Sequence, residues 1–298
     1  NRHSMAAAVK TRITQILSAD AMMEAFPVGI LAMFELEKGA LYVVATPIGN
    51  LADLSPRARA VLADADLICA EDTRHTRNML HAIGLDRPLL ALHEHNESER
   101  VQQILARLQS GESLALVSDA GTPLISDPGY RLVRELRAAG ITVSPIPGPC
   151  AAIAALSVAG IASDRFCFEG FLPHKASARR ERLQALSAEP RTLVFYESAH
   201  RIEESLADMI GAFGAQRDAV LAREISKLFE TVLHGGLQAI AEKVAADPNQ
   251  RKGEFVLIIA GAPEDENAAL VEGRRLYAKL VEVMKPSQAA KIAADLSG

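Results

Sequence analysis

Short apolar runs alternate with longer segments of helical periodicity from residue 39 onward. The runs predict buried strands, and the periodic segments predict amphipathic helices. Alternation in this order is typical of a mostly parallel sheet with helices on both faces. The predicted strands of this first block are 41–45, 67–70, 89–92, 114–117 and 141–145. Helices are predicted to begin near residues 56, 73, 97 and 130.

A second alternating block follows a rigid Pro-Gly-Pro segment and an Ala-rich helix predicted at 150–159. Its predicted strands are 166–171, 192–196, 219–222 and 255–260, with a further short strand at 231–233. Their hairpin-like spacing predicts a mixed sheet. The fold class is therefore α/β, with two α/β domains and a short helical C-terminal tail. We predict an N-terminal extension (1–38), an N-terminal domain (39–148), a connecting helix (149–163), a C-terminal domain (164–262) and the tail (263–298).

The composition narrows the class of protein. No apolar run reaches the ~18 residues that a membrane helix needs. The extension lacks the order of charged, apolar and small residues that is typical of a secretory signal. Cys69, Cys150 and Cys167 are odd in number and far apart, so we expect no disulfide framework and a reducing, cytoplasmic setting. A net charge of −5 argues against a broad nucleic-acid footprint, although the charge is uneven and residues 175–182 form a local basic cluster.

The loop at 117–129 has the richest chemistry of the chain. It follows a predicted strand, as ligand-binding loops of open α/β sheets do, and it offers Asp119, Thr122 and Ser126 beside two glycines and two prolines. One reading is a capped helix start, with Ser126 or Asp127 as N-cap and Pro128 at the first helical position. That reading leaves 119–122 unexplained.

Loops after the other strands carry weaker signals. The loop at 46–51 holds one glycine and a proline, which disfavours both a dinucleotide fingerprint and a phosphate loop. After the second strand, Asp72 is a good N-cap, whereas Arg74, His75 and Arg77 place cations where the helix dipole disfavours them, so a contact with a polar or anionic ligand is an open alternative. His93 and His95 have no diagnostic metal spacing, and we predict no metal site.

The second block places polar residues after its strands as well. These are Tyr196-Glu197, the segment 223–230 with Glu224 and Lys227, and Glu254. The charged residues of 223–230 fit either a surface ion-pair set or a role in a cleft.

Taken in order, the motifs TPIGNL, AEDTRHT, SDAGTPLISDPG, PGP, GFLPHK, VFYESAHR, ARE-SK-FE and GEFVLII resemble those of the ribosomal RNA small subunit methyltransferase I group, within the tetrapyrrole methylase superfamily. The likeness runs from about residue 41 to 261. Members that act on tetrapyrroles show G-D-P where this chain has Gly121-Thr122-Pro123, which favours the RNA branch.

The resemblance implies a homodimeric enzyme with S-adenosylmethionine as methyl donor, held in a cleft between two α/β domains. It also implies transfer to the ribose 2′-oxygen of a cytidine in the decoding region of 16S ribosomal RNA in the small subunit. By motif, the donor site comprises Asp119, Gly121, Thr122, Ile125, Ser126, Pro147, Gly148, Ala151, Tyr196, Glu197, Glu254 and Phe255. Pro47 and Gly49 border the acceptor.

Two further sets follow from side-chain chemistry. A ribose hydroxyl is a poor nucleophile, so a base or a nearby charge helps, and the candidates are Glu71, Asp72, His75, Glu224 and Lys227. We expect phosphate contacts from Arg74, Arg77, Lys175, Arg179 and Arg180. Two rivals remain: a methylase acting on a polycarboxylate macrocycle, which needs a basic trough, and a non-catalytic RNA-binding protein, which needs no polar donor loop.

Overall fold

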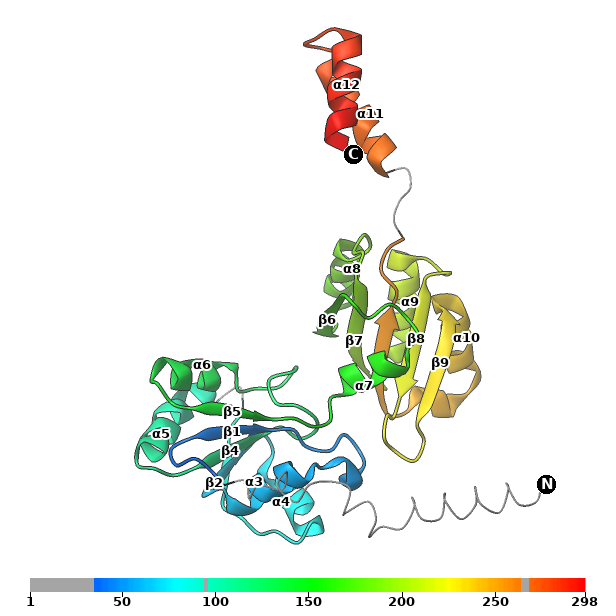
Figure 1. Ribbon diagram of the computed structural model, residues 1–298. Coiled ribbons are helices and arrows are strands. Elements are labelled where there is room, and N and C mark those ends of the chain that lie inside the picture. Colours follow the sequence, from blue (N-terminus) through cyan, green and yellow to red (C-terminus); the bar gives the residue numbers. More distant parts are fainter. Residues whose placement is uncertain (1–34, 94–95, 264–267, 298) are drawn as a thin grey trace, which may run out of the picture. The chain divides into compact units, whose positions relative to one another are not determined.

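The computed structural model describes residues 35–93, 96–263 and 268–297 (Figure 1). Most of the predicted N-terminal extension, together with Glu94 and His95, lies outside these residues. Contacts divide the described chain into two compact units. Unit 1 contains the residues up to Val44, Ser55–Val117 and Gly129–Ile146; unit 2 contains Ala45–Leu54, Ser118–Pro128 and the residues from Pro147 onward.

Unit 1 is built on an all-parallel sheet of five strands in the order β3-β2-β4-β1-β5. The strands are β1 (Leu41–Val44), β2 (Leu67–Ala70), β3 (Leu89–Ala91), β4 (Leu114–Val117) and β5 (Val143–Ile146). The strand expected at 141–145 begins two residues later. The reason is local: the amide of Ile141 donates to the Leu136 carbonyl at 3.0 Å and closes the end of the preceding helix around Gly140, which has φ 77°.

Helices cover both faces of this sheet, as the alternation predicts. Figure 1 shows α3 (Pro56–Asp64) and α4 (Thr73–Ala82) on one face, and α5 (Glu97–Gln109) and α6 (Tyr130–Ala138) on the other. Ser55 and Asp72 cap α3 and α4 through their side-chain oxygens. These caps and the first positions of the helices agree with the sequence pattern.

The predicted N-cap of α6 is wrong. Its N-cap is Gly129, with φ 123°, rather than Ser126 or Asp127, and no side chain of the N-cap bonds the helix. Instead, the amide of Leu132 donates to the carboxylate of Glu97 at 2.7 Å, and Glu97 comes from the neighbouring helix α5. A tertiary contact therefore satisfies a free amide at the start of α6, where the pattern predicted a local cap.

Unit 2 contains a mixed sheet of five strands in the order β6-β7-β10-β8-β9. The strands are β6 (Phe166–Phe171), β7 (Thr192–Ser198), β8 (Asp218–Arg223), β9 (Thr231–Gly236) and β10 (Glu254–Ile259). Only β6 and β7 are parallel, and the other pairs are antiparallel. The hairpin-like spacing is thus confirmed as a mixed sheet, and the short strand expected at 231–233 is the edge strand β9.

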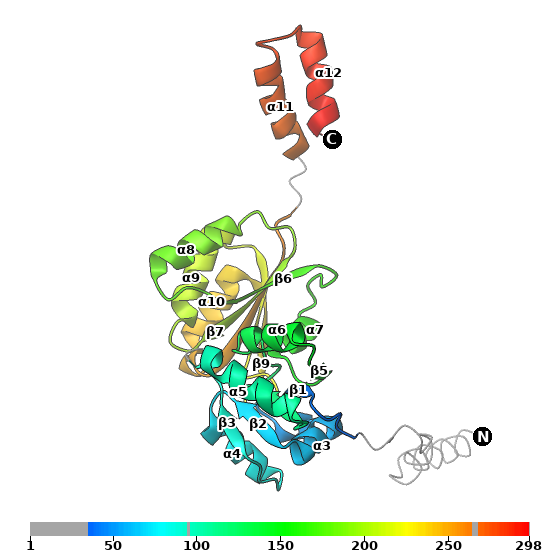
Figure 2. The same cartoon turned by 90° about the vertical axis from the view of Figure 1, so that its left-hand side faces the viewer.

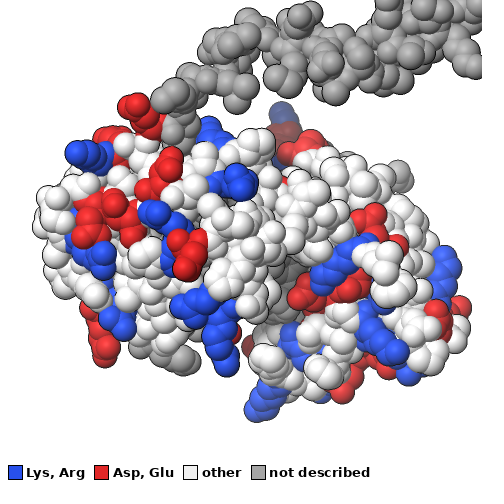
Figure 3. Space-filling view, turned by 90° about the horizontal axis from the view of Figure 1, so that it is seen from below, with Lys and Arg blue, Asp and Glu red and all other residues white. Residues whose placement is uncertain are grey.

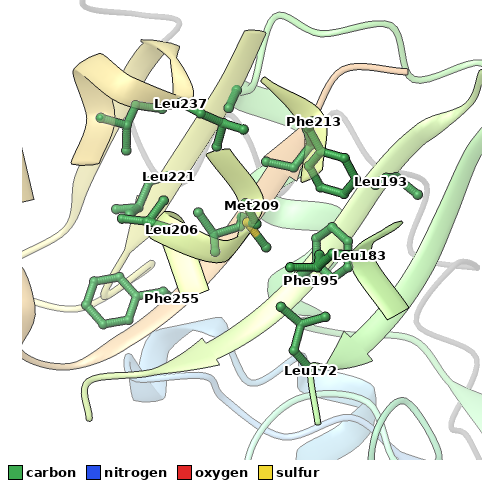
Figure 4. Close-up of a cluster of buried hydrophobic side chains, with 14 of the residues drawn as sticks. Leu172, Leu183, Leu193, Phe195, Leu206, Met209, Phe213, Leu221, Leu237 and Phe255 are labelled. Atoms are coloured by element: carbon green, nitrogen blue, oxygen red, sulfur yellow. The ribbon is translucent and has the colours of Figure 1, made fainter. Parts of the chain in front are cut away.

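The two faces of this sheet bury different layers. Phe195, Leu221 and Leu257 pack into one cluster with α8 (Ala176–Ala185), α9 (Ile202–Phe213) and α10 (Leu237–Ala246), and Figure 4 shows this core. Their neighbours along the strands, such as Val194 and Ile258, pack into a second cluster with α7 (Ala151–Val158). This alternation is the two-residue period of a β-strand. It determines which side chains of the sheet can reach a ligand on a given face.

The C-terminal tail is a pair of helices, α11 (Ala268–Leu280) and α12 (Pro286–Ser297), which pack against each other (Figure 2). Ala289 and Ala293 are buried. Unit 2 also holds two short 3-10 helices, η2 (Leu51–Asp53) and η3 (Pro248–Arg251). Across the ranges that the structure describes, no helix combines the length and the apolar character needed to cross a bilayer.

Candidate functional site

The strand order of unit 1 creates a topological switch point between β1 and β4. These strands are neighbours, but the chain leaves β1 towards α3 and leaves β4 towards α6, on opposite faces. Open α/β sheets bind ligands in the crevice at such a point. The two loops that start there, 45–54 and 118–128, are grouped by their contacts with unit 2.

Backbone hydrogen bonds join these two loops. The amide of Thr46 donates to the Gly121 carbonyl at 2.9 Å, and the amide of Gly121 donates to the Thr46 carbonyl at 3.1 Å. The buried hydroxyl of Thr46 also donates to the Ser118 carbonyl at 3.2 Å. The hydroxyl of Thr122 links loop 118–128 to the Pro-Gly-Pro turn, because it donates to the Pro149 carbonyl at 3.0 Å.

The loop 118–128 stores backbone strain. Leu124 has φ 73° and Ser126 has φ 69°, and both are left-handed conformations that side chains other than glycine rarely adopt. Each such residue costs roughly 1–3 kcal/mol and tends to occur at functional sites. Gly121, with φ 82°, takes the same conformation without that cost.

A β-bulge in β6 accommodates this strained loop. The register of β6 against β7 shifts between Phe168 and Gly170, and Gly170 has φ 63°. A Cβ atom at Gly170 would lie 3.0 Å from the hydroxyl oxygen of Ser126. The sequence analysis did not include Gly170 in the predicted site. A glycine within a strand pattern could have indicated it, because such a glycine marks a bulge or the close approach of another segment.

Two carboxylates lie in the same loop. Asp127 is half-buried, and its pKa is raised to about 6: burial raises it most, a hydrogen bond with Ser118 opposes the rise, and the negative charge of Asp119 adds to it. A cation held between the two carboxylates would relieve both burial and repulsion. The sequence pattern indicated Asp119 but assigned Asp127 only to helix capping.

Aromatic rings form a wall beside this loop. Tyr196 makes edge-to-face contacts with Phe168 and Phe171, with ring centroids 5.0 Å and 5.6 Å apart. Its hydroxyl accepts a hydrogen bond from the amide of Ala152 at 3.1 Å, in the first turn of α7. Burial raises the pKa of Tyr196, so its hydroxyl stays protonated at neutral pH.

The strand period turns two of the expected donor residues away from this wall. The fully buried carboxylate of Glu197 pairs with Arg201 at 2.7 Å and accepts a hydrogen bond from the hydroxyl of Ser205 at 2.5 Å. Phe255 is buried in the helix-covered core. Beside Tyr196, both residues can offer a ligand their backbone only.

The PGP turn and the start of α7 complete this side. A Cβ at Gly148 would lie 2.9 Å from the Cβ of Ala45, so only glycine allows this close approach. Pro147 is exposed, and Ala151 is the first residue of α7. Ile125, at the tip of the strained loop, is exposed as well.

A lysine held by two glutamates lies against the other loop. The ammonium of Lys227 is 2.8 Å from Oε1 of Glu224 and 2.9 Å from Oε2 of Glu254. Burial alone would lower the pKa of Lys227, but the hydrogen bonds to Glu224 and Glu254 outweigh burial and raise it. A Cβ at Gly49 would lie 2.2 Å from Cγ of Lys227, so the lysine stem covers this glycine.

A second contact joins the same two segments. The hydroxyl of Ser226 donates to the carboxylate of Asp53 in η2. Glu224 and Ser226 have φ 51° and 69°, so this loop is strained as loop 118–128 is. Neither Asp53 nor Ser226 was predicted, because only the fold makes them neighbours.

The cluster after β2 belongs to unit 1, next to β4 in the sheet. Asp72 accepts from the amide of Arg74 at 2.8 Å and pairs with its guanidinium at 3.2 Å, and these hydrogen bonds lower the pKa of Asp72. The capping reading of Asp72 is therefore confirmed. Glu71 is half-buried, and His75 and Arg77 are exposed on the first turns of α4.

The basic residues of α8 divide into two kinds. Arg179 is 2% exposed and pairs with Asp208 at 2.7 Å and Glu204 at 3.1 Å, so its charge is used inside the protein. Arg180 and Lys175 are exposed. We therefore leave Arg179 out of the proposed phosphate contacts. Figure 3 shows basic and acidic side chains interspersed on the visible face, without one broad basic patch.

Known proteins are similar to this chain in sequence. Residues 40–241 match the family model described as Tetrapyrrole (Corrin/Porphyrin) Methylases. A Xylella fastidiosa (strain Temecula1) protein named ribosomal RNA small subunit methyltransferase I is 62% identical over 87% of this chain and 95% of its own length. A Pseudomonas aeruginosa protein of the same name is 54% identical over 88% of this chain and 94% of its own.

Solved structures agree on the fold. The structure of uroporphyrin-III C-methyl transferase from Thermus thermophilus, complexed with S-adenyl homocysteine, aligns with a TM-score of 0.51 over 74% of this chain and 97% of its own, at 17% identity. The family model and the curated relatives identify the family of the chain. It belongs to the tetrapyrrole methylase family, in the ribosomal RNA small subunit methyltransferase I group.

Proposed function

We propose that this chain transfers a methyl group from S-adenosylmethionine to the ribose 2′-oxygen of a cytidine in small-subunit ribosomal RNA. The observation that carries the proposal is the strained loop 118–128 with its two carboxylates, at the switch point of a fold shared with relatives named for this reaction class. The Gly121-Thr122-Pro123 sequence in this loop favours RNA over a tetrapyrrole as the acceptor.

The residues of the loop fit the proposed donor. The donor has a sulfonium, an ammonium and a carboxylate, and when bound it supplies an electrophilic methyl group. We propose that Asp119 and Asp127 face its cationic groups, which explains why a half-buried carboxyl such as Asp127 is tolerated there. The backbone amide of Ser126 suits its carboxylate, and the aromatic wall at Tyr196 suits its adenine.

On the acceptor side, we propose that Lys227 orients the reacting ribose. Because Glu224 and Glu254 hold its ammonium protonated, Lys227 cannot accept the hydroxyl proton at neutral pH. It can instead stabilise negative charge that develops on the oxygen. Alignment of oxygen, methyl and sulfur supplies most of the acceleration, roughly 7–11 kcal/mol for well-oriented groups.

The proton acceptor stays among the predicted candidates. Glu224 is a weak base, because its pKa is lowered: burial would raise it, but the hydrogen bond from Lys227 outweighs burial. Asp72 is occupied as a helix cap. Glu71 and His75 are the remaining candidates, and both come from the loop and helix after β2.

We further propose that Arg74, Arg77, Lys175 and Arg180 contact RNA phosphates, that the enzyme is a homodimer, and that it acts in the cytoplasm. The exposure of these four side chains supports the first point. Sedimentation of the purified protein tests the second.

The test is transfer of labelled methyl from S-adenosylmethionine to undermethylated small ribosomal subunits, with the product nucleoside identified. We expect a ribose-methylated cytidine. Donor binding without transfer to RNA, combined with transfer to a uroporphyrin-type macrocycle, would contradict the proposal and favour the tetrapyrrole alternative.

A further inference from the structure

The loop after β8, residues 224–230, exposes two adjacent apolar side chains at its tip. Leu228 is 89% exposed and Phe229 is 66% exposed. Removal of such side chains from water is favourable. An aromatic and an aliphatic side chain that project together from one loop indicate a contact with something outside the chain.

Hydrogen bonds hold this tip in a defined conformation. The buried guanidinium of Arg223 donates to the Phe229 carbonyl at 2.9 Å. The amide of Ser226 donates to Oε2 of Glu230 at 2.7 Å, which closes the loop across its tip. A pre-organised surface loses little conformational freedom on binding, so it is suited to recognition.

The tip is also anchored next to the proposed acceptor segment. Ser226 bonds Asp53, and the stem of Lys227 covers Gly49, so residues on either side of the tip touch loop 45–54. Leu51, in the same short helix as Asp53, is a further exposed apolar residue at 47%. Whatever occupies the tip therefore lies beside the acceptor segment.

We infer that Leu228 and Phe229 form a platform that receives an unstacked nucleobase of the RNA acceptor, an inference that rests on the proposed function. Proteins that recognise RNA by sequence mostly contact bases that lie out of the stack, and such a base needs a new partner. Aromatic side chains provide that partner in single-stranded RNA recognition.

The charges around the tip favour a neutral base over other occupants. Four carboxylates at the loop, those of residues 53, 224, 230 and 254, outnumber the two cations Arg223 and Lys227, so the loop would not attract an anionic membrane surface. A second copy of the chain meeting the tip about a two-fold axis would bring the same carboxylates together. A nucleobase carries an apolar face and no charge.

The test compares Phe229→Ala and Phe229→Trp with the wild-type chain. The probe is a fluorescent single-stranded oligoribonucleotide containing cytidine, titrated by anisotropy, together with kcat/KM for methyl transfer to small subunits. Loss of a base–aromatic stack should weaken RNA binding by roughly 5- to 150-fold, and tryptophan should restore it. Phe166→Ala is the matched control, because Phe166 is also exposed but lies at the opposite end of β6 from the site.

Donor affinity, measured by calorimetry, should be the same in all four proteins. Equal RNA affinity of Phe229→Ala and wild type would overturn the platform, and so would a dimer-to-monomer change in Phe229→Ala on sedimentation, which would make the tip a contact between copies. If the wild type transfers methyl groups to RNA and Phe229→Ala does so equally well, the platform is refuted and the proposed function stands. Weakened RNA binding in Phe229→Ala without any wild-type transfer would support the platform and refute the function.

Discussion

At the scale of single residues, we expect the half-buried Asp127 to give the proposed donor site a pH dependence. Its pKa of about 6 means that it is protonated below pH 6 and charged above it. If it faces a cation, donor affinity should rise as the pH increases through about 6 and then level off. Calorimetric titration of S-adenosylmethionine between pH 5 and 8 measures this.

Asp127→Asn should flatten that profile, whereas Asp164→Asn, at an exposed position in the same unit, should leave it unchanged. The sign for stability is the reverse of the usual case for aspartate. Because the folded pKa lies above the unfolded value of about 3.9, the unliganded protein loses stability as the pH rises from about 4 to about 6. A flat donor profile for wild type would remove Asp127 from the site.

Gly49→Ala tests the lysine on the acceptor side. The new methyl group would displace the stem of Lys227, so we expect methyl transfer to fall roughly 10- to 100-fold with donor affinity unchanged. Gly84→Ala is the control, since Gly84 also has a positive φ, of 75°, but a Cβ there meets nothing within 4 Å. Equal losses of activity in both variants would mean that backbone strain, rather than Lys227, is responsible.

Residue by residue, the sequence pattern located the polar loops but could not predict how their side chains are used. Local chemistry identified Asp72 as a cap correctly. It failed at Asp127, because the partner that replaces the expected cap is Glu97, 30 positions away. The contact of Ser226 with Asp53 spans 173 positions and leaves no local signal.

At the scale of elements, helices α8 and α9 separate a structural arginine from an exposed one. Arg179→Ala should destabilise the fold by about 3 kcal/mol, because it leaves Asp208, 14% exposed, without its main partner. Arg180→Ala should cost no more than about 1 kcal/mol, because Arg180 is 61% exposed and lies 3.6 Å from the same carboxylate. Urea denaturation gives both values.

RNA binding should show the opposite order. Arg180→Ala should weaken it, and Arg179→Ala, assayed where it is still folded, should not. An equal loss of RNA affinity in both variants would return Arg179 to the phosphate contacts. Periodicity and composition predict the helix itself well, but the buried side of α8 depends on Asp208 of α9, which helical spacing alone does not reveal.

At the scale of the whole molecule, the net charge of −5 limits how the chain can bind RNA. The proposed contacts are four exposed cations: Arg74, Arg77, Lys175 and Arg180. Each phosphate contact to single-stranded RNA contributes about −0.7 to the slope of log K against log salt, so we expect a slope of about −3. Anisotropy titrations at several salt concentrations measure it, and a slope near zero would mean that these residues do not contact phosphates.

Strand and helix order in both units follow from the sequence, because period-two and period-3.6 patterns report burial directly. The grouping of loops 45–54 and 118–128 with unit 2 does not, since it arises from contacts with distant segments. The domain limits at 148 and 163 stay a prediction.

That grouping has a consequence for dissecting the protein. The chain passes from one unit to the other at five places, namely 44/45, 54/55, 117/118, 128/129 and 146/147. Two units joined by a single linker can be separated there into independent fragments. A cut at 147 in this chain would leave loops 45–54 and 118–128 on the fragment that lacks the rest of unit 2. Segments of the two units thus alternate along the chain. We expect neither half to bind the donor when it is expressed alone.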